Sequence, residues 1–158
     1  MKSNNNSSPV NGEADRNNLL LVDDEAIFHR FFIADFDTFT VHSAYDANGA
    51  LRQLAAHPQM ALAVIDLSFD GGYTFGGLDL IAAIHGKFPH LPIVAISKYQ
   101  SVTYQSDTTA LSDLAIQAGA KHFKSKADYS ISGWQRLFKK LITTKPKKRV
   151  KNEKLPYY

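Results

Sequence analysis

The chain contains no cysteine, which excludes several kinds of site at once. Without thiols it can form no disulfide framework, no thiolate metal site and no cysteine nucleophile. It also lacks an apolar run long enough to span a bilayer, and its polar N-terminal segment lacks the apolar core of a secretion signal. We therefore expect a cytoplasmic protein with no membrane insertion.

Basic charge is concentrated at one end of the chain. The net charge is +3, yet residues 145–158 alone carry six bases and one acid. Removing this +5 leaves −2 for residues 1–144. The basic character therefore belongs to a tail, and a nucleic-acid partner is not expected from overall charge. The length of 158 residues and the apolar content of 44% suit one globular domain.

Short apolar runs alternate with amphipathic segments five times along the chain. The runs, which we interpret as strands, cover 19–22, 38–44, 61–65, 92–96 and 121–124. The amphipathic segments, which we interpret as helices, cover 25–36, 46–56, 78–88, 107–118 and 132–143. Asp46 is the expected N-cap of the second helix, Gly119 is expected just past the end of the fourth, and a polar loop is expected from 98 to about 107.

This alternation is typical of a doubly wound α/β fold with a five-stranded parallel sheet covered on both faces. We assign the folded domain to residues 18–144. Residues 1–17, rich in Asn and Ser, are expected to form a disordered leader, and residues 145–158 a disordered basic tail.

Polar side chains stand where the predicted strands end. Asp23 and Asp24 follow the first strand, Asp66 the third and Ser97 the fourth, while Lys126 lies just beyond the fifth. The carboxyl ends of parallel strands share one edge of a doubly wound sheet. The five residues are therefore predicted to converge on one site.

Three carboxylates in one site need a cation. At roughly 5 Å and an effective dielectric near 20, each pair repels by about 3 kcal/mol. Oxygen ligands with retained waters favour Mg²⁺ over a transition metal. One carboxylate can then act as a nucleophile toward phosphorus, with the Lys126 ammonium offsetting charge on the phosphoryl oxygens and Ser97 donating a hydrogen bond to one of them.

Four stretches of the sequence resemble the receiver domain of two-component response regulators. They are Leu-Leu-Leu-Val-Asp-Asp-Glu at 19–25, Ala-Val-Ile-Asp-Leu at 63–67, Ile-Val-Ala-Ile-Ser at 93–97 and Ala-Gly-Ala-Lys-His-Phe-Lys-Ser-Lys at 118–126. The resemblance covers about residues 18–144. It implies a flavodoxin-like (βα)5 fold and a signalling switch, as opposed to a metabolic enzyme.

The resemblance also implies individual roles around the acceptor. Asp66 would take a phosphoryl group from a sensor histidine kinase or a phosphotransfer protein. Asp23 and Asp24 would hold Mg²⁺ together with Asp66 and the backbone carbonyl of Ser68.

Three further residues are expected to report the phosphorylated state. By resemblance, Ser97 is the switch hydroxyl, Lys126 the lysine that contacts the phosphoryl group, and Phe123 the aromatic switch residue. Output would come from docking on an unknown partner protein, since the sequence encodes no effector domain. A homodimer through the face of the fourth and fifth strands is a further expectation.

The sequence departs from the receiver pattern beside the acceptor. Asp70 replaces the usual proline, and the loop 70–77 is longer than usual and carries four glycines. Lys98 and Tyr99 follow the switch serine, where a small residue is usual, and Ala127 replaces a proline after the lysine. We expect Asp70, Lys98 and Tyr99 to modulate donor choice or the lifetime of the phosphate.

Alternative functions remain open at this point. The chain could be an interaction module that works without phosphorylation, or an effector that contacts nucleic acid through its tail. A haloacid-dehalogenase-type phosphatase is less favoured, because Ser68 stands where a second aspartate would be needed. The six histidines show no metal-ligand spacing and are interpreted as surface or core residues: His29, His42, His57, His85, His90 and His122.

Overall fold

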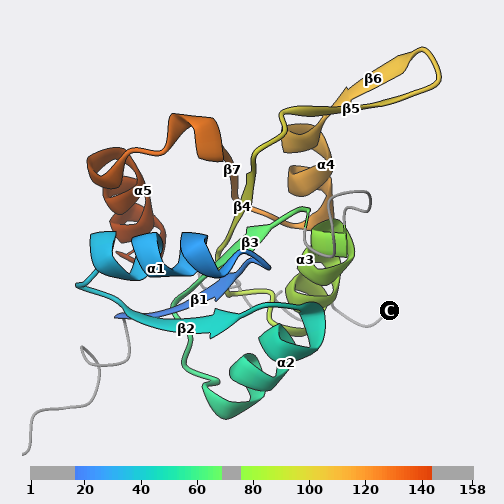
Figure 1. Cartoon of the computed structure of the whole chain (residues 1–158). Coiled ribbons are helices and arrows are strands. Elements are labelled where there is room, and N and C mark those ends of the chain that lie inside the picture. Colours follow the sequence, from blue (N-terminus) through green and yellow to red (C-terminus); the bar gives the residue numbers. More distant parts are fainter. Residues whose placement is uncertain (1–16, 69–75, 144–158) are drawn as a thin grey trace, which may run out of the picture.

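A computed structural model describes residues 17–68 and 76–143 (Figure 1). In this part of the chain, five parallel strands form one sheet in the order β2-β1-β3-β4-β7. The strands are β1 (Asn18–Val22), β2 (Thr40–Ala44), β3 (Leu62–Asp66), β4 (Ile93–Ser97) and β7 (His122–Ser125). The helices are α1 (Ala26–Asp35), α2 (Ala47–Ala56), α3 (Gly76–Lys87), α4 (Leu111–Ala118) and α5 (Ile131–Thr143), with a short 3-10 turn, η2 (Lys126–Asp128). The predicted doubly wound (βα)5 fold is confirmed.

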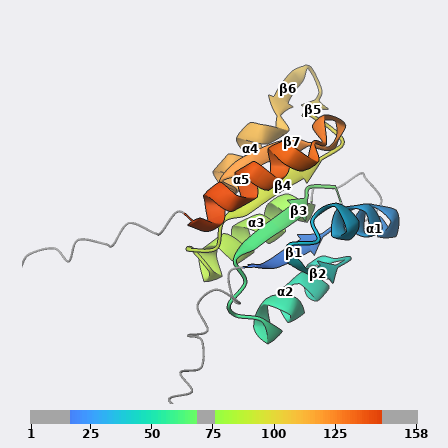
Figure 2. The same cartoon turned by 90° about the vertical axis from the view of Figure 1, so that its left-hand side faces the viewer.

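Helices cover both faces of the sheet, as Figures 1 and 2 show. Successive residues of a strand point to opposite faces, so β1 contributes to two separate cores. Leu19 and Leu21 join Phe32 of α1 and Trp134 of α5 in one of them. Because β1, β3 and β4 are buried and have apolar residues on both faces, these three strands are continuous apolar runs in the sequence.

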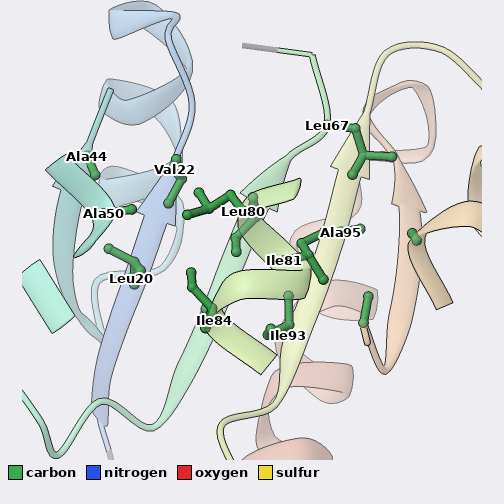
Figure 3. Packing of buried hydrophobic residues seen from close by; sticks show 14 of the residues in the cluster. Leu20, Val22, Ala44, Ala50, Leu67, Leu80, Ile81, Ile84, Ile93 and Ala95 are labelled. Carbon is green, nitrogen blue, oxygen red and sulfur yellow. The ribbon is translucent and has the colours of Figure 1, made fainter. Parts of the chain in front are cut away.

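The second core lies between the sheet and helices α2, α3 and α4. Leu20 and Val22 of β1 pack there with Leu80 and Ile81 of α3 (Figure 3). Complete burial of each such side chain contributes about 1.5–3 kcal/mol. This packing fixes the strands, and with them the residues that follow each strand end.

Two predicted helix boundaries are confirmed. Asp46 caps α2, since its Oδ1 accepts a hydrogen bond from the backbone N–H of Gly49 at 2.6 Å. Gly119 ends α4 with φ +121°, and a Cβ built there would lie 2.5 Å from the ring of His85. Glycine therefore satisfies both the positive φ and the close helix contact.

The segment between β4 and α4 differs from the prediction. The expected polar loop contains an antiparallel hairpin of β5 (Ser101–Tyr104) and β6 (Asp107–Ala110), and α4 begins at Leu111 instead of near 107. A two-residue turn joins the strands, with Gln105 at φ +56°. The hairpin projects away from the main sheet above α4 (Figure 1).

Several predictions lie outside the described residues. They concern the leader, the basic tail, and Asp70 with the rest of the loop 70–77 except Gly76 and Gly77. Within the described ranges, none of the helices is both long enough and apolar enough to cross a membrane.

Candidate functional site

The carboxyl edge of the sheet brings together the side chains that follow its strands. Asp23 comes directly after β1, Asp66 is the last residue of β3, and Lys126 begins the turn after β7. Strand register places Asp66 opposite Ile96, so Ser97 lies one residue further along the neighbouring strand. Convergence of strand ends, predicted from the sequence, is thus present in the fold.

Lys126 connects two of the carboxylates directly. Its Nζ lies 2.6 Å from Oδ2 of Asp23 and 3.5 Å from Oδ2 of Asp66, both of which are buried. The contact with Asp23 is a charge pair without the alignment of a hydrogen bond, whereas Lys126 donates a long hydrogen bond to Asp66. The ring centre of Phe28 lies 4.4 Å from the same ammonium group. The lysine is therefore held by two anions and one aromatic face.

Asp66 occupies an environment that disfavours its charge. Burial raises the pKa of its carboxyl from the ordinary value of 3.8 to about 6, and the nearby charge of Asp23 adds to the increase. The Lys126 ammonium and the backbone N–H of Ser68, 3.3 Å from Oδ1, act in the opposite direction. An additional cation would relieve this unfavourable charge.

A cluster of acidic oxygens includes Asp23, which shares the Lys126 ammonium with Asp66. One ligand atom from each of Asp23, Asp24 and Glu25 lies within 4.8 Å of the others. Asp23 is buried, Asp24 is exposed, and the backbone N–H of Glu25 donates to Oδ1 of Asp23 at 2.8 Å. Oδ2 of Asp23 is buried and, apart from its charge pair with Lys126, has no hydrogen-bond partner among the described residues. This all-oxygen set fits a hard divalent cation. Glu25 was not predicted as part of it, although the run of three acids was visible in the sequence.

The predicted switch residues lie on β4, which pairs with β3, and on β7, which pairs with β4. Ser97 is buried at the end of β4, and its Oγ accepts a hydrogen bond from the backbone N–H of Tyr99 at 3.0 Å. Phe123 on β7 is partly buried and packs against the core under α3 and α4. Among the described residues, neither side chain forms a hydrogen bond with Asp66, so their switching roles stay predictions.

The residues predicted to modulate the site lie at its rim. Lys98 is exposed and pairs with Glu25 at 3.3 Å, which links the end of β4 to the acidic cluster. The Lys98 ammonium also lies 5.8 Å from the ring centre of Tyr99. Ser68 is buried, and its hydroxyl oxygen has no hydrogen-bond partner among the described residues.

Solved structures share this fold. The receiver domain of NtrX from Brucella abortus is 23% identical with a TM-score of 0.66, over 80% of this chain and 99% of that one. A CheY-like receiver domain protein from Methanospirillum hungatei JF-1 is 19% identical with a TM-score of 0.62, over 79% and 92% of the two chains. The protein has the fold of a receiver domain.

Another structure with the receiver fold carries relevant chemistry. It is a response regulator protein from Burkholderia pseudomallei with a phosphorylated aspartic acid, a calcium ion and citrate, 21% identical with a TM-score of 0.60, over 75% of this chain and 64% of that one. The chain spans about a quarter of longer NtrX chains, 26% in the complex with ADP. No protein-family model and no curated protein sequence matches this receiver-fold chain.

Proposed function

We propose that the protein is a phosphorelay switch that accepts a phosphoryl group on Asp66 from a sensor histidine kinase or a phosphotransfer protein. The observation that carries the proposal is the contact of Lys126 with both Asp23 and Asp66 at the carboxyl edge of a receiver fold. The Asp66 carboxylate is buried beside the Lys126 ammonium, and the same ammonium contacts Asp23 of the acidic cluster.

The reaction is an in-line displacement at phosphorus. A carboxylate oxygen of Asp66 forms a bond to phosphorus while the P–N bond of a phosphohistidine breaks, and the imidazole keeps the electron pair. Lys126 offsets negative charge on the phosphoryl oxygens, and Ser97 donates a hydrogen bond to one of them. We propose that Asp23, Asp24, Asp66 and the Ser68 carbonyl hold Mg²⁺, which supplies further positive charge. Apart from slow loss of this phosphate, we expect no turnover.

The donor protein would dock over the exposed side of α1. Ile27 and Phe31 lie one turn apart on this helix and are 51% and 61% exposed. Phe28, from the same turn, contacts Lys126 and thereby places this surface beside the acceptor. Large exposed apolar side chains grouped on a helix are typical of a protein interface.

Output would follow from a shift between two conformations at the face of β4 and β7. Ser97 and Phe123 are the proposed reporters of the phosphorylated state, and an unknown output protein or a second copy of the chain would bind this face. A soluble cytoplasmic location fits such a role.

The proposal is tested by incubating the protein with acetyl phosphate and Mg²⁺ and measuring the intact mass. One added phosphate is expected in the wild type and none in Asp66→Asn. A wild-type protein that gains no phosphate under conditions that phosphorylate a known receiver would contradict the proposal.

The projecting hairpin favours a second candidate function, that of an interaction module that works without phosphorylation. Tyr104 is 78% exposed, and two-stranded hairpins are only marginally stable in water. A variant in which Asn-Gly replaces residues 103–108 would remove the end of the hairpin and keep the pairing of Val102 with Thr109. Loss of partner binding in both phosphorylation states, with phosphorylation intact, would support the module; retained binding would argue against it.

A further inference from the structure

His29 of α1 is a buried histidine that makes a hydrogen bond through each ring nitrogen. Its Nε2 lies 2.7 Å from the backbone carbonyl oxygen of Asp23, and its Nδ1 lies 2.8 Å from Oγ of Ser43 on β2. The ring also packs against Tyr45 in a tilted arrangement, with 4.4 Å between ring centres. The sequence alone indicated only a surface or core position for this residue.

The partners of His29 define its tautomer. A carbonyl oxygen can only accept, so Nε2 must carry the hydrogen and donate it to Asp23. In the neutral ring Nδ1 then accepts from the Ser43 hydroxyl. Ser43 on β2 thereby orients a ring on α1, and the ring in turn holds the residue that follows β1.

These hydrogen bonds hold Asp23 through its backbone and not through its carboxylate. The N–H of Asp23 donates to the carbonyl of Ala44 at 3.1 Å, while its carbonyl accepts from His29. Its carboxylate is therefore left to face Lys126 and the neighbouring acids. Because Asp24 and Glu25 follow directly, the same anchor sets the path of the whole acidic loop.

We infer that His29 is a positioning residue that holds the acidic loop in the geometry required to bind a divalent cation. The inference deepens the proposed function and rests on it, because it requires the cation site at Asp23 and Asp24. His29 itself would not touch the ion; it acts through the Asp23 backbone. Hydrogen-bond partners of this kind, behind the ligands, typically change metal affinity by about 10- to 100-fold.

Mg²⁺ binding to the full chain, measured by isothermal titration calorimetry without any phosphoryl donor, tests the inference. His29→Leu should weaken binding by about 10- to 100-fold. His29→Gln, whose amide can donate to one partner and accept from the other, should restore affinity to within about threefold of the wild type. His42→Leu is the matched control, since His42 bonds to Asn18 on β1 away from the acidic loop, and its affinity should equal the wild type.

Ser43→Ala provides a second test of the inference if His29→Leu fails to fold. This variant removes only the hydroxyl that orients the ring, and we expect Mg²⁺ affinity to fall with the circular dichroism spectrum unchanged. The inference would be overturned if a folded His29→Leu or Ser43→Ala variant bound Mg²⁺ with wild-type affinity. It would also be overturned if His29→Gln and His29→Leu weakened binding equally. Either result would leave the proposed phosphorelay function intact. A wild-type protein that binds no Mg²⁺ would overturn the proposed cation site as well.

Discussion

The Lys126 ammonium lies 2.6 Å from Oδ2 of Asp23, closer than the 3.5 Å that separates it from Asp66. The lysine is thus paired more tightly with an acid of the proposed metal site than with the proposed acceptor. A bound cation and the ammonium would both be attracted to the same buried oxygen. Lys126 and the cation are therefore competitors at Asp23 and partners around a phosphoryl group.

Removal of the Lys126 charge should strengthen metal binding. We predict that Lys126→Met binds Mg²⁺ about tenfold more tightly, a change of roughly 1.4 kcal/mol, because Asp23 loses its competing cation. Calorimetric titration of both proteins measures this. Lys87→Met, which removes an exposed charge at the end of α3, controls for net charge. Unchanged or weaker binding in Lys126→Met would contradict competition at Asp23.

Asp66→Asn should stabilise the metal-free protein at neutral pH. Because the folded-state pKa of Asp66 is raised from 3.8 to about 6, ionisation opposes folding increasingly as pH rises through this window. Above pH about 6, the ionised Asp66 lowers the free energy of unfolding by roughly 3 kcal/mol. The uncharged Asn side chain avoids part of this loss.

Urea unfolding in EDTA at pH 7.5 and at pH 4 measures the effect. The variant should exceed the wild type in free energy of unfolding by about 1–3 kcal/mol at pH 7.5, and by much less at pH 4, where the wild-type carboxyl is protonated. Asp37→Asn, at an exposed turn position, is the matched control for the loss of one carboxylate charge. An equal difference at both pH values would disprove the assigned burial cost.

The succession of strands along the chain and the convergence of Asp23, Asp66 and Lys126 were predictable from the sequence. Strands buried on both faces must be apolar throughout, so 19–22, 61–65 and 92–96 are distinct from the amphipathic helices between them. The polar residue after each run then marks the shared carboxyl edge.

The hairpin at 101–110 and the supports of the site were not predictable in the same way. The hairpin turn uses Gln105 with positive φ, where Asn-Gly or Asp-Gly would have signalled it, and its strands are mostly exposed and polar. His29 acts through a backbone carbonyl and Phe28 through its ring face. Such contacts depend on how α1 packs against the strand ends, which periodicity does not specify.

The Phe28 ring should hold the Lys126 side chain in place. Substitution Phe28→Leu removes the cation–π attraction, worth about 0.5–1 kcal/mol, and we predict a two- to fivefold slower phosphorylation by acetyl phosphate. Phe28→Tyr should retain the wild-type rate. The NMR signals of the Lys126 ε-methylene protons, shifted by the ring in the wild type and in Phe28→Tyr, should move to ordinary values in Phe28→Leu. Identical signals in Phe28→Leu would show that the ring does not hold the lysine.

Exposed apolar residues on α1 should matter for a protein donor and not for a small one. We predict that the double variant Ile27→Ser, Phe31→Ser accepts phosphate from acetyl phosphate at the wild-type rate, because both side chains face solvent. Transfer from a phosphorylated histidine phosphotransfer protein should fall at least about tenfold, a loss typical of interface residues. Ile116→Ser on α4, 50% exposed, should leave both rates unchanged. Equal loss with both donors would contradict a docking role for α1.

The most direct test of the central claim is chemical mapping of the phosphorylated residue. After phosphorylation with acetyl phosphate and Mg²⁺, borohydride reduces an aspartyl phosphate to homoserine, which peptide mass spectrometry locates. We predict homoserine at position 66 and none in unphosphorylated protein. The assignment of Asp66 as the phosphoryl acceptor would be contradicted if the phosphate were found on a different side chain. It would also be contradicted if phosphorylated wild-type protein gave no homoserine at position 66.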